Sequence, residues 1–194
     1  HWRKGNLKWY KLTFAAMIYQ LLKPLLFLLS PETAHRLTVF LLDFAAAFPP
    51  SRWLLRSLFC HKSRKMQRRV LGLDFPNPVG LAAGFDKDGK HIEGLACLGF
   101  GFIEVGTLTP VAQPGNEQPR LFRLPADRAL INRMGFNNGG VQAAVERLRA
   151  RKPGILVGGN IGKNKNTPNE RATDEYLKCF EALHTVVDYF VVNV

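Results

Sequence analysis

Short apolar runs of the β-strand type alternate with helical patterns from residue 70 to the end of the chain. We expect strands at 70–75, 79–82, 102–106, 155–160 and 189–194, and helices at 88–98, 141–151 and 172–186. This alternation, with strands that are apolar along their length, is typical of a buried parallel sheet. The doubly wound α/β fold and the (β/α)8 barrel both fit it. The sequence contains neither GxGxxG nor a Walker A loop, which disfavours the doubly wound nucleotide-binding class.

The net charge of +12 is concentrated in the first third of the chain. Residues 1–69 carry 13 Lys and Arg against 2 Asp and Glu, whereas residues 70–194 carry 14 against 13. Leu and Phe dominate the spaces between the early charges, a pattern typical of an element that lies on a membrane surface. A basic patch for nucleic acid is the alternative. We expect peripheral membrane association and no nucleic-acid partner.

Residues 17–69 are predicted to form an amphipathic, membrane-associating helical extension. The apolar run at 17–29 is too short and too interrupted to span a bilayer. Ser30-Pro31-Glu32 predicts a helix start, Pro49-Pro50 ends that helix, and Ser51 is expected to cap a third short helix. The alternative is a helical cap packed on its own domain. Residues 1–16 are interpreted as a basic extension that is either non-native or the result of a mis-set start.

The cysteines and histidines indicate no metal site. Cys60, Cys97 and Cys179 are far apart and lack metal-type spacing, and the five histidines form no ligand pattern. The cysteines therefore fit ordinary packing in a reducing compartment.

Four of the expected strands end in small, polar or amide residues. They are Ala82 to Lys87, Gly106-Thr107, Asn160 to Lys163, and Asn193. Barrel enzymes build their active sites at the carboxyl ends of parallel strands, and glycine there lets backbone approach a flat cofactor closely. Residues 131–138 add several amides and one guanidinium, which suit a ring with C=O and N–H groups and a carboxylate. These loops are expected to gather at one rim.

Six segments in order resemble class 2, quinone-dependent dihydroorotate dehydrogenases. The flavin-loop signature matches Asn77-Pro78-Val79-Gly80-Leu81-Ala82-Ala83-Gly84-Phe85-Asp86-Lys87-Asp88-Gly89. The other matching segments are 99–107, 119–125, 131–138, 159–165 and 189–194. Residues 31–37 resemble the helical extension on the quinone side of that class, so the resemblance covers about 17–194.

The resemblance implies an α/β fold in which residues 70–194 form the first half of an FMN-binding (β/α)8 TIM barrel, preceded by the small amphipathic extension. It implies a flavoprotein that oxidises (S)-dihydroorotate to orotate in UMP synthesis and passes electrons to a membrane quinone. The expected location is the cytoplasmic side of a bacterial inner membrane, with the mitochondrial inner membrane as the alternative. Alternative functions are another FMN barrel, such as a soluble dihydroorotate dehydrogenase or a tRNA-dihydrouridine synthase, and a non-enzymatic membrane-binding remnant.

The resemblance also implies roles for individual residues. The FMN contacts would be Ala83, Gly84, Phe85, Asp86, Lys87, Thr107, Asn160 and Asn193. The substrate contacts would be Lys87, Asn132, Arg133, Met134, Gly135, Phe136 and Asn193, and the quinone side would hold His35, Arg36 and Arg123. The catalytic base would be a serine beyond Val194, so this N-terminal fragment is expected to be inactive alone.

Overall fold

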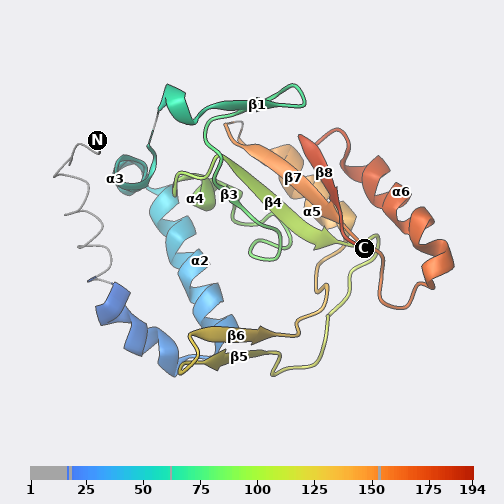
Figure 1. Ribbon diagram of the computed structural model, residues 1–194, viewed down its shortest axis with the longest axis horizontal. Helices are drawn as coiled ribbons and strands as arrows, with labels where there is room; N and C mark the ends of the chain where they lie inside the picture. Colours follow the sequence, from blue (N-terminus) through green and yellow to red (C-terminus); the bar gives the residue numbers. More distant parts are fainter. Residues whose placement is uncertain (1–16, 18, 62, 153) are drawn as a thin grey trace.

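A computed structural model describes residue 17 and residues 19–61, 63–152 and 154–194 (Figure 1). The predictions for residues 1–16 lie outside this range. The centre is a parallel sheet in the order β3-β4-β7-β8. Its strands are β3 (Gly80–Leu81), β4 (Phe102–Leu108), β7 (Leu156–Ile161) and β8 (Tyr189–Val192), and the helices between them are α4 (Ile92–Ala96), α5 (Val141–Ala150) and α6 (Ala172–Leu183).

The three connecting helices pack on one face of the sheet. One core cluster joins alternate residues of β4 and β7 to the apolar sides of all three helices: Ile103, Val105, Val157 and Ile161 from the strands, Leu95 from α4, Leu148 from α5 and Leu183 from α6. A doubly wound sheet carries helices on both faces. Helices on one face alone agree instead with the barrel class, in which they form an outer ring.

The opposite face of the sheet carries an aromatic cluster. Phe102 of β4 lies edge-on to Phe75 at 5.3 Å and to Tyr189 of β8 at 6.3 Å between ring centroids. Gly158 makes room for this arrangement, because a Cβ there would lie 2.4 Å from the Tyr189 ring. Tyr189 also donates a hydrogen bond of 3.2 Å to Glu104 Oε1, and burial raises the pKa of its phenol.

Phe75 belongs to a hairpin where a single strand at 70–75 was expected. Strands β1 (Arg68–Val70) and β2 (Leu73–Phe75) pair antiparallel. The turn between them needs positive φ at Leu71 (+49°) and Gly72 (+82°), and glycine adopts that conformation easily. The prediction was wrong because the apolar pattern continues through the turn at Leu71.

The extension consists of short helices, with helical residues at 19–28, α2 (Pro31–Ala47) and α3 (Pro49–Phe59). Ser30 Oγ accepts a hydrogen bond of 3.2 Å from Thr33 N, which confirms the predicted cap. The prediction for Ser51 was wrong: α3 begins at Pro49, where proline suits the first helical position, and Ser51 Oγ donates back to Ala45 O. In the described part of the chain, no helix is long and apolar enough to cross a membrane.

Two further elements differ from the prediction. The helix expected at 88–98 is limited to Ile92–Ala96, because the backbone of residues 86–91 instead wraps around the Asp86 carboxylate. Residues for which no strand was predicted form an antiparallel hairpin of β5 (Leu121–Leu124) and β6 (Ala129–Asn132), which lies beside the lower end of α2 in Figure 1. Short 3-10 turns, η1 (Arg64–Met66) and η2 (Asn169–Arg171), complete the described structure.

Candidate active site at the carboxyl ends of the strands

Three polar side chains meet where β4, β7 and β8 end. Thr107 Oγ1 donates a hydrogen bond of 2.6 Å to Asn160 Oδ1, and Asn193 Nδ2 donates one of 2.8 Å to Thr107 Oγ1. Thr107 and Asn160 are each 6% exposed, while Asn193 is half-buried. The parallel register holds them in line, since Asn193 N also bonds to Ile161 O. We call these three residues the rim triad.

The loop after β3 leaves its backbone open beside the triad. Gly84 N donates to Gly106 O at 2.8 Å, which ties this loop to the end of β4. Gly84 has a φ of +103°, and a Cβ there would find no atom within 4 Å. A planar group can therefore approach the backbone closely at this point.

Asp86 shapes this loop from inside. It is 2% exposed, and its two carboxylate oxygens accept from Lys90 N and His91 N at 2.8 Å each. Both oxygens of its carboxylate are thus hydrogen-bonded to backbone N–H groups of its own loop. Neighbouring Phe85 is 39% exposed and meets the His35 ring edge-on at 4.6 Å.

Lys87 points from this loop toward the segment after β6. Its Nζ donates to Gly135 O at 3.1 Å and to Asn137 Oδ1 at 2.5 Å. Burial lowers the pKa of Lys87, and the positive charge of Arg120 lowers it further, whereas Glu32 opposes the shift. The ammonium is therefore a partly desolvated donor that a negative group would stabilise.

Asn138 fastens that segment to the end of β4. Its Oδ1 accepts from Gly140 N at 2.8 Å and from Thr109 N at 3.3 Å, and its Nδ2 donates to Phe136 O at 2.8 Å. The Phe136 ring lies against Gly162, where a Cβ would sit 3.3 Å from the ring and 2.6 Å from Thr107 Cγ2. Phe136 is therefore close to the triad.

The side chains at the beginning of the same segment make local contacts. Asn132 Oδ1 accepts from Met134 N at 2.9 Å, so this amide shapes its own turn. The Arg133 guanidinium donates to Pro119 O and lies 5.5 Å from the centre of the Phe122 ring. Within the described residues, no hydrogen bond joins Asn132 or Arg133 to the triad.

The residues expected on the quinone side line the junction with the extension. His35 rests on Phe85, and burial, followed by the charge of His91, lowers its pKa. Arg123 Nη1 donates to Leu29 O at 2.6 Å, and its guanidinium lies 4.5 Å from the Phe27 ring centre. Arg36 is exposed on α2.

An ion pair at this junction was not predicted from the sequence. Arg120 Nε donates to Glu32 Oε1 at 2.9 Å and Nη2 to Glu32 Oε2 at 3.1 Å, with side chains 8% and 18% exposed. Glu32 was recognised only as an acid in the first turn of a helix. The two residues are 88 positions apart, so no local pattern could have linked them.

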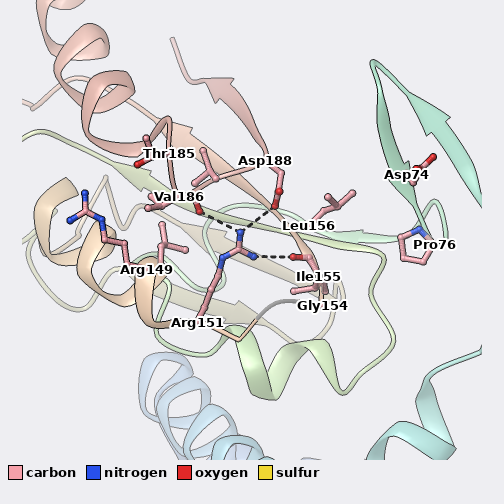
Figure 2. Close-up of a pocket in the computed structure, with 12 residues that line it drawn as sticks. Asp74, Pro76, Arg149, Arg151, Gly154, Ile155, Leu156, Thr185, Val186 and Asp188 are labelled. Carbon is pink, nitrogen blue, oxygen red and sulfur yellow. Dashed lines mark hydrogen bonds and ion pairs between the residues drawn. The ribbon is translucent and has the colours of Figure 1, made fainter.

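A hollow lies at the opposite ends of the strands. It measures about 740 Å³ and is lined by the start of β7 and the approach to β8 (Figure 2). Arg151 donates to Ile155 O at 2.9 Å and pairs with Asp188 Oδ2 at 3.3 Å, and that same oxygen accepts from Val157 N. Because these polar groups are hydrogen-bonded to one another, we interpret this hollow as part of the stabilising framework and not as a binding site. Residues at this end of a barrel usually contribute to stability.

Comparisons with known proteins decide the family. The family profile described as dihydroorotate dehydrogenase matches residues 65–194. The chain belongs to the dihydroorotate dehydrogenase family, in its quinone-dependent class. Two relatives named dihydroorotate dehydrogenase (quinone) are those of Christiangramia forsetii, 55% identical over 92% of this chain and 52% of the relative, and Alkalilimnicola ehrlichii, 54% identical over 91% and 51%.

This dihydroorotate dehydrogenase family member also resembles solved structures. The crystal structure of the Eimeria tenella enzyme in complex with ferulenol matches 84% of this chain and 43% of its own, at 37% identity and a TM-score of 0.70. The mixed α/β structure with its parallel sheet is thus of the TIM-barrel type. The chain spans about half the length of the curated relatives it matches.

Within the described residues of this family member, no three His, Cys, Asp or Glu side chains cluster as metal ligands would.

Proposed function

We propose that the protein to which this chain belongs oxidises (S)-dihydroorotate to orotate with FMN and passes the electrons to a membrane quinone, in UMP synthesis. Family membership supports this assignment. The observation that carries it is Lys87: its ammonium reaches Gly135 O and Asn137 Oδ1 from a loop tied to the same β4 end as Thr107. The Lys87 ammonium could thus bind a planar anion, and the amide side chains and the open backbone at Gly84 could bind a flat cofactor beside it.

The residues at the rim fit FMN. The open backbone at Gly84 accepts a flat ring, and the triad supplies amide and hydroxyl groups for its polar edge. Ala83, Gly84, Lys87, Thr107, Asn160 and Asn193 would hold the cofactor, with Phe85 and Asp86 shaping the loop. Bound FMN would supply the two-electron acceptor chemistry that side chains lack.

The substrate would lie between Lys87 and the segment that begins at Asn132. Its carboxylate would pair with the Lys87 ammonium, and the amide of Asn193 would hold the edge of the pyrimidine ring. Met134, Gly135 and Phe136 would close over it. Asn132 and Arg133, at the start of the segment, would complete the substrate contacts.

We also propose that the parallel sheet is part of a (β/α)8 barrel whose residues begin near 70, and that residues 17–69 are a membrane-associating extension. The extension exposes large apolar side chains, including Phe40, Phe44 and Trp53, beside the basic Arg52 and Arg56. This combination suits peripheral association with an anionic bilayer. His35, Arg36 and Arg123 would flank the quinone entrance, on the cytoplasmic side of a bacterial inner membrane.

Residues 1–194 expressed by themselves would not turn over dihydroorotate. Strands β3 and β8 each pair along one edge, and Phe180, Leu177 and Val192 are 46–55% exposed. Unpaired edges and exposed apolar side chains favour aggregation over cofactor binding. A soluble preparation of these residues that carries FMN and melts cooperatively would contradict this expectation.

The test uses the full-length parent protein and a soluble quinone analogue. We expect dihydroorotate-dependent quinone reduction, and a loss of about 100-fold or more in kcat/KM for Lys87→Ala. The matched control is Lys152→Ala, which removes an exposed lysine whose partner is Glu93. Absence of dihydroorotate oxidation in the parent would reject the function, and full activity of Lys87→Ala would remove Lys87 from the site. Reduction of dihydrouridine-free tRNA instead would favour the tRNA-modifying alternative.

A further inference from the structure

The Arg120 guanidinium joins the extension to the loop before β5. Two of its nitrogens bind both oxygens of Glu32, in the first turn of α2. Its Nη1 donates to Pro114 O at 2.8 Å and to Asn116 O at 3.0 Å. Arg120 is 7% exposed and uses all three guanidinium nitrogens. Such a fork holds both partners in one geometry, which a lysine could not do.

The loop held by Arg120 in turn holds the segment beside Lys87. Asn116 N donates to Met134 O at 2.9 Å, and Asn116 Nδ2 donates to Arg133 O at 2.8 Å. Arg133 N donates to Arg120 O at 2.9 Å. The next carbonyl along the segment, Gly135 O, accepts from Lys87 Nζ. Hydrogen bonds, joined by the backbone of Asn116 and of residues 133–135, therefore connect α2 to the Lys87 ammonium.

We propose that Glu32 and Arg120 are positioning residues, which dock the helical extension onto the substrate segment and set where that segment lies relative to the Lys87 ammonium. This inference rests on the proposed function. It makes α2 a structural part of the dihydroorotate site as well as of the extension. Neither residue needs to touch the substrate for this role.

The same pair acts on Lys87 through charge. The positive charge of Arg120 lowers the pKa of Lys87, and the negative charge of Glu32 raises it. The other charged or titratable groups near Lys87 are His35 on α2 and Asp86 and Asp88 on its own loop. Glu32 and Arg120 therefore stabilise each other but shift the pKa of Lys87 in opposite directions. This difference distinguishes an effect on Lys87 from a general loss of stability.

Lys87 binds an anion while it is protonated, and it releases the anion as the pH rises through its pKa. Removing Arg120 removes a contribution that lowers this pKa, so binding should persist to higher pH. Removing Glu32 removes a contribution that raises it, so binding should be lost at lower pH. Loss of stability alone would weaken binding in both variants without moving their pH midpoints apart.

The experiment uses the full-length FMN-loaded parent and orotate as the probe. The variants are Glu32→Gln and Arg120→Gln, with Asp174→Asn as the control, because Asp174 forms an exposed pair with Arg171 on the surface. Orotate dissociation constants are measured from the flavin absorbance change between about pH 7 and about pH 10. FMN content and melting temperature are recorded for each protein.

We expect both variants to weaken orotate binding about 10-fold or more near neutral pH, since a small displacement of a positioned group has an effect of this order. The pH midpoint for loss of binding should fall in Glu32→Gln and rise in Arg120→Gln. Arg120→Lys keeps the positive charge but loses the two-pronged guanidinium geometry. It should therefore weaken orotate binding while the pH midpoint stays at the wild-type value. If Arg120→Gln does not fold, this conservative variant tests the role of Arg120 in its place.

Unchanged orotate affinity in the variants, or midpoints that move in the same direction, would overturn the inference. Failure of the wild-type parent to bind orotate or oxidise dihydroorotate would instead reject the proposed function. Amide hydrogen exchange over residues 132–137 gives a readout independent of activity: it should quicken in both variants and stay unchanged in Asp174→Asn.

Discussion

Thr107 on β4 and Asn160 on β7 are 53 residues apart in the sequence, and their buried side chains share a hydrogen bond of 2.6 Å at the carboxyl ends of adjacent strands. The Thr107 hydroxyl also accepts from Asn193 Nδ2. One hydroxyl thus orients two amides, one on β7 and one just after β8, and it leaves Asn160 Nδ2 and Asn193 Oδ1 for other partners.

Thr107→Val should destabilise the rim triad in the full-length protein. Valine is close in shape but leaves the buried Asn160 oxygen unpaired, at a cost of about 1–3 kcal/mol. We expect a lower melting temperature and reduced FMN retention, measured by thermal unfolding and flavin absorbance. Thr173→Val, at an exposed position on α6, is the control. Wild-type FMN retention in Thr107→Val would argue against a cofactor role for this hydroxyl.

Asn138→Ala should loosen the segment beside Lys87. The substitution removes hydrogen bonds to Thr109, Phe136 and Gly140, and we expect a loss of about 2 kcal/mol of local stability. The KM for dihydroorotate should rise more than kcat falls, and hydrogen exchange over 131–137 should quicken. Asn169→Ala, at an exposed residue of η2, provides the comparison. An unaltered exchange rate would show that Asn138 does not hold the segment.

The Glu32–Arg120 pair should contribute stability that is lost in acid. Hydrogen bonding by Arg120 lowers the pKa of Glu32 below its ordinary value of 4.5. The folded state therefore favours the ionised form, and the contribution is fully present above the unfolded-state pKa. As the pH falls through the lowered folded-state pKa, this contribution disappears.

The measurement is the difference in unfolding free energy between wild type and Glu32→Gln as a function of pH. We expect a difference of about 2 kcal/mol near neutrality, since the variant leaves the guanidinium with a weaker partner. The difference should shrink as the pH falls below about 4. A constant difference across that range would mean that the carboxylate charge is not what stabilises the junction.

The exposed aromatic side chains of the extension should bind lipid. Phe44 is 62% exposed and Trp53 is 71% exposed. Phe44→Ser combined with Trp53→Ser should lower partitioning of the full-length protein to anionic vesicles by about 10-fold or more, because each removes a large apolar area. Val111→Ser, at a residue 67% exposed after β4, is the matched control. If the double variant bound vesicles as well as the wild type, Phe44 and Trp53 would not be lipid contacts.

Much of the rim could be predicted from the sequence. Apolar runs located strands β4, β7 and β8 to within two residues at each end, and the residues at the carboxyl ends of such strands meet at one edge in any parallel arrangement. Thr107, Asn160 and Asn193 are neighbours for this reason. The Ser30 cap and the proline boundary at Pro49 follow from local backbone chemistry in the same way.

Other features could not be predicted, because they depend on contacts between distant segments. The β1–β2 turn falls inside an apolar run, and the β5–β6 hairpin is stabilised by its position beside α2 as well as by its own pattern. The resemblance implied a substrate role for Arg133, which stays a prediction. The position of its side chain over Phe122 could not be predicted, because that contact exists only once the hairpin forms.

The sequence by itself therefore determined the order of the parallel strands and of the helices between them, the polar character of the strand ends and the family, because each depends on short-range pattern. Only the tertiary structure decided that α4, α5 and α6 cover one face of the sheet, that Asn138 fastens its segment to Thr109, and that Glu32 meets Arg120. Side chains 29 and 88 residues apart are brought together by sheet register and helix docking, which the local sequence does not encode.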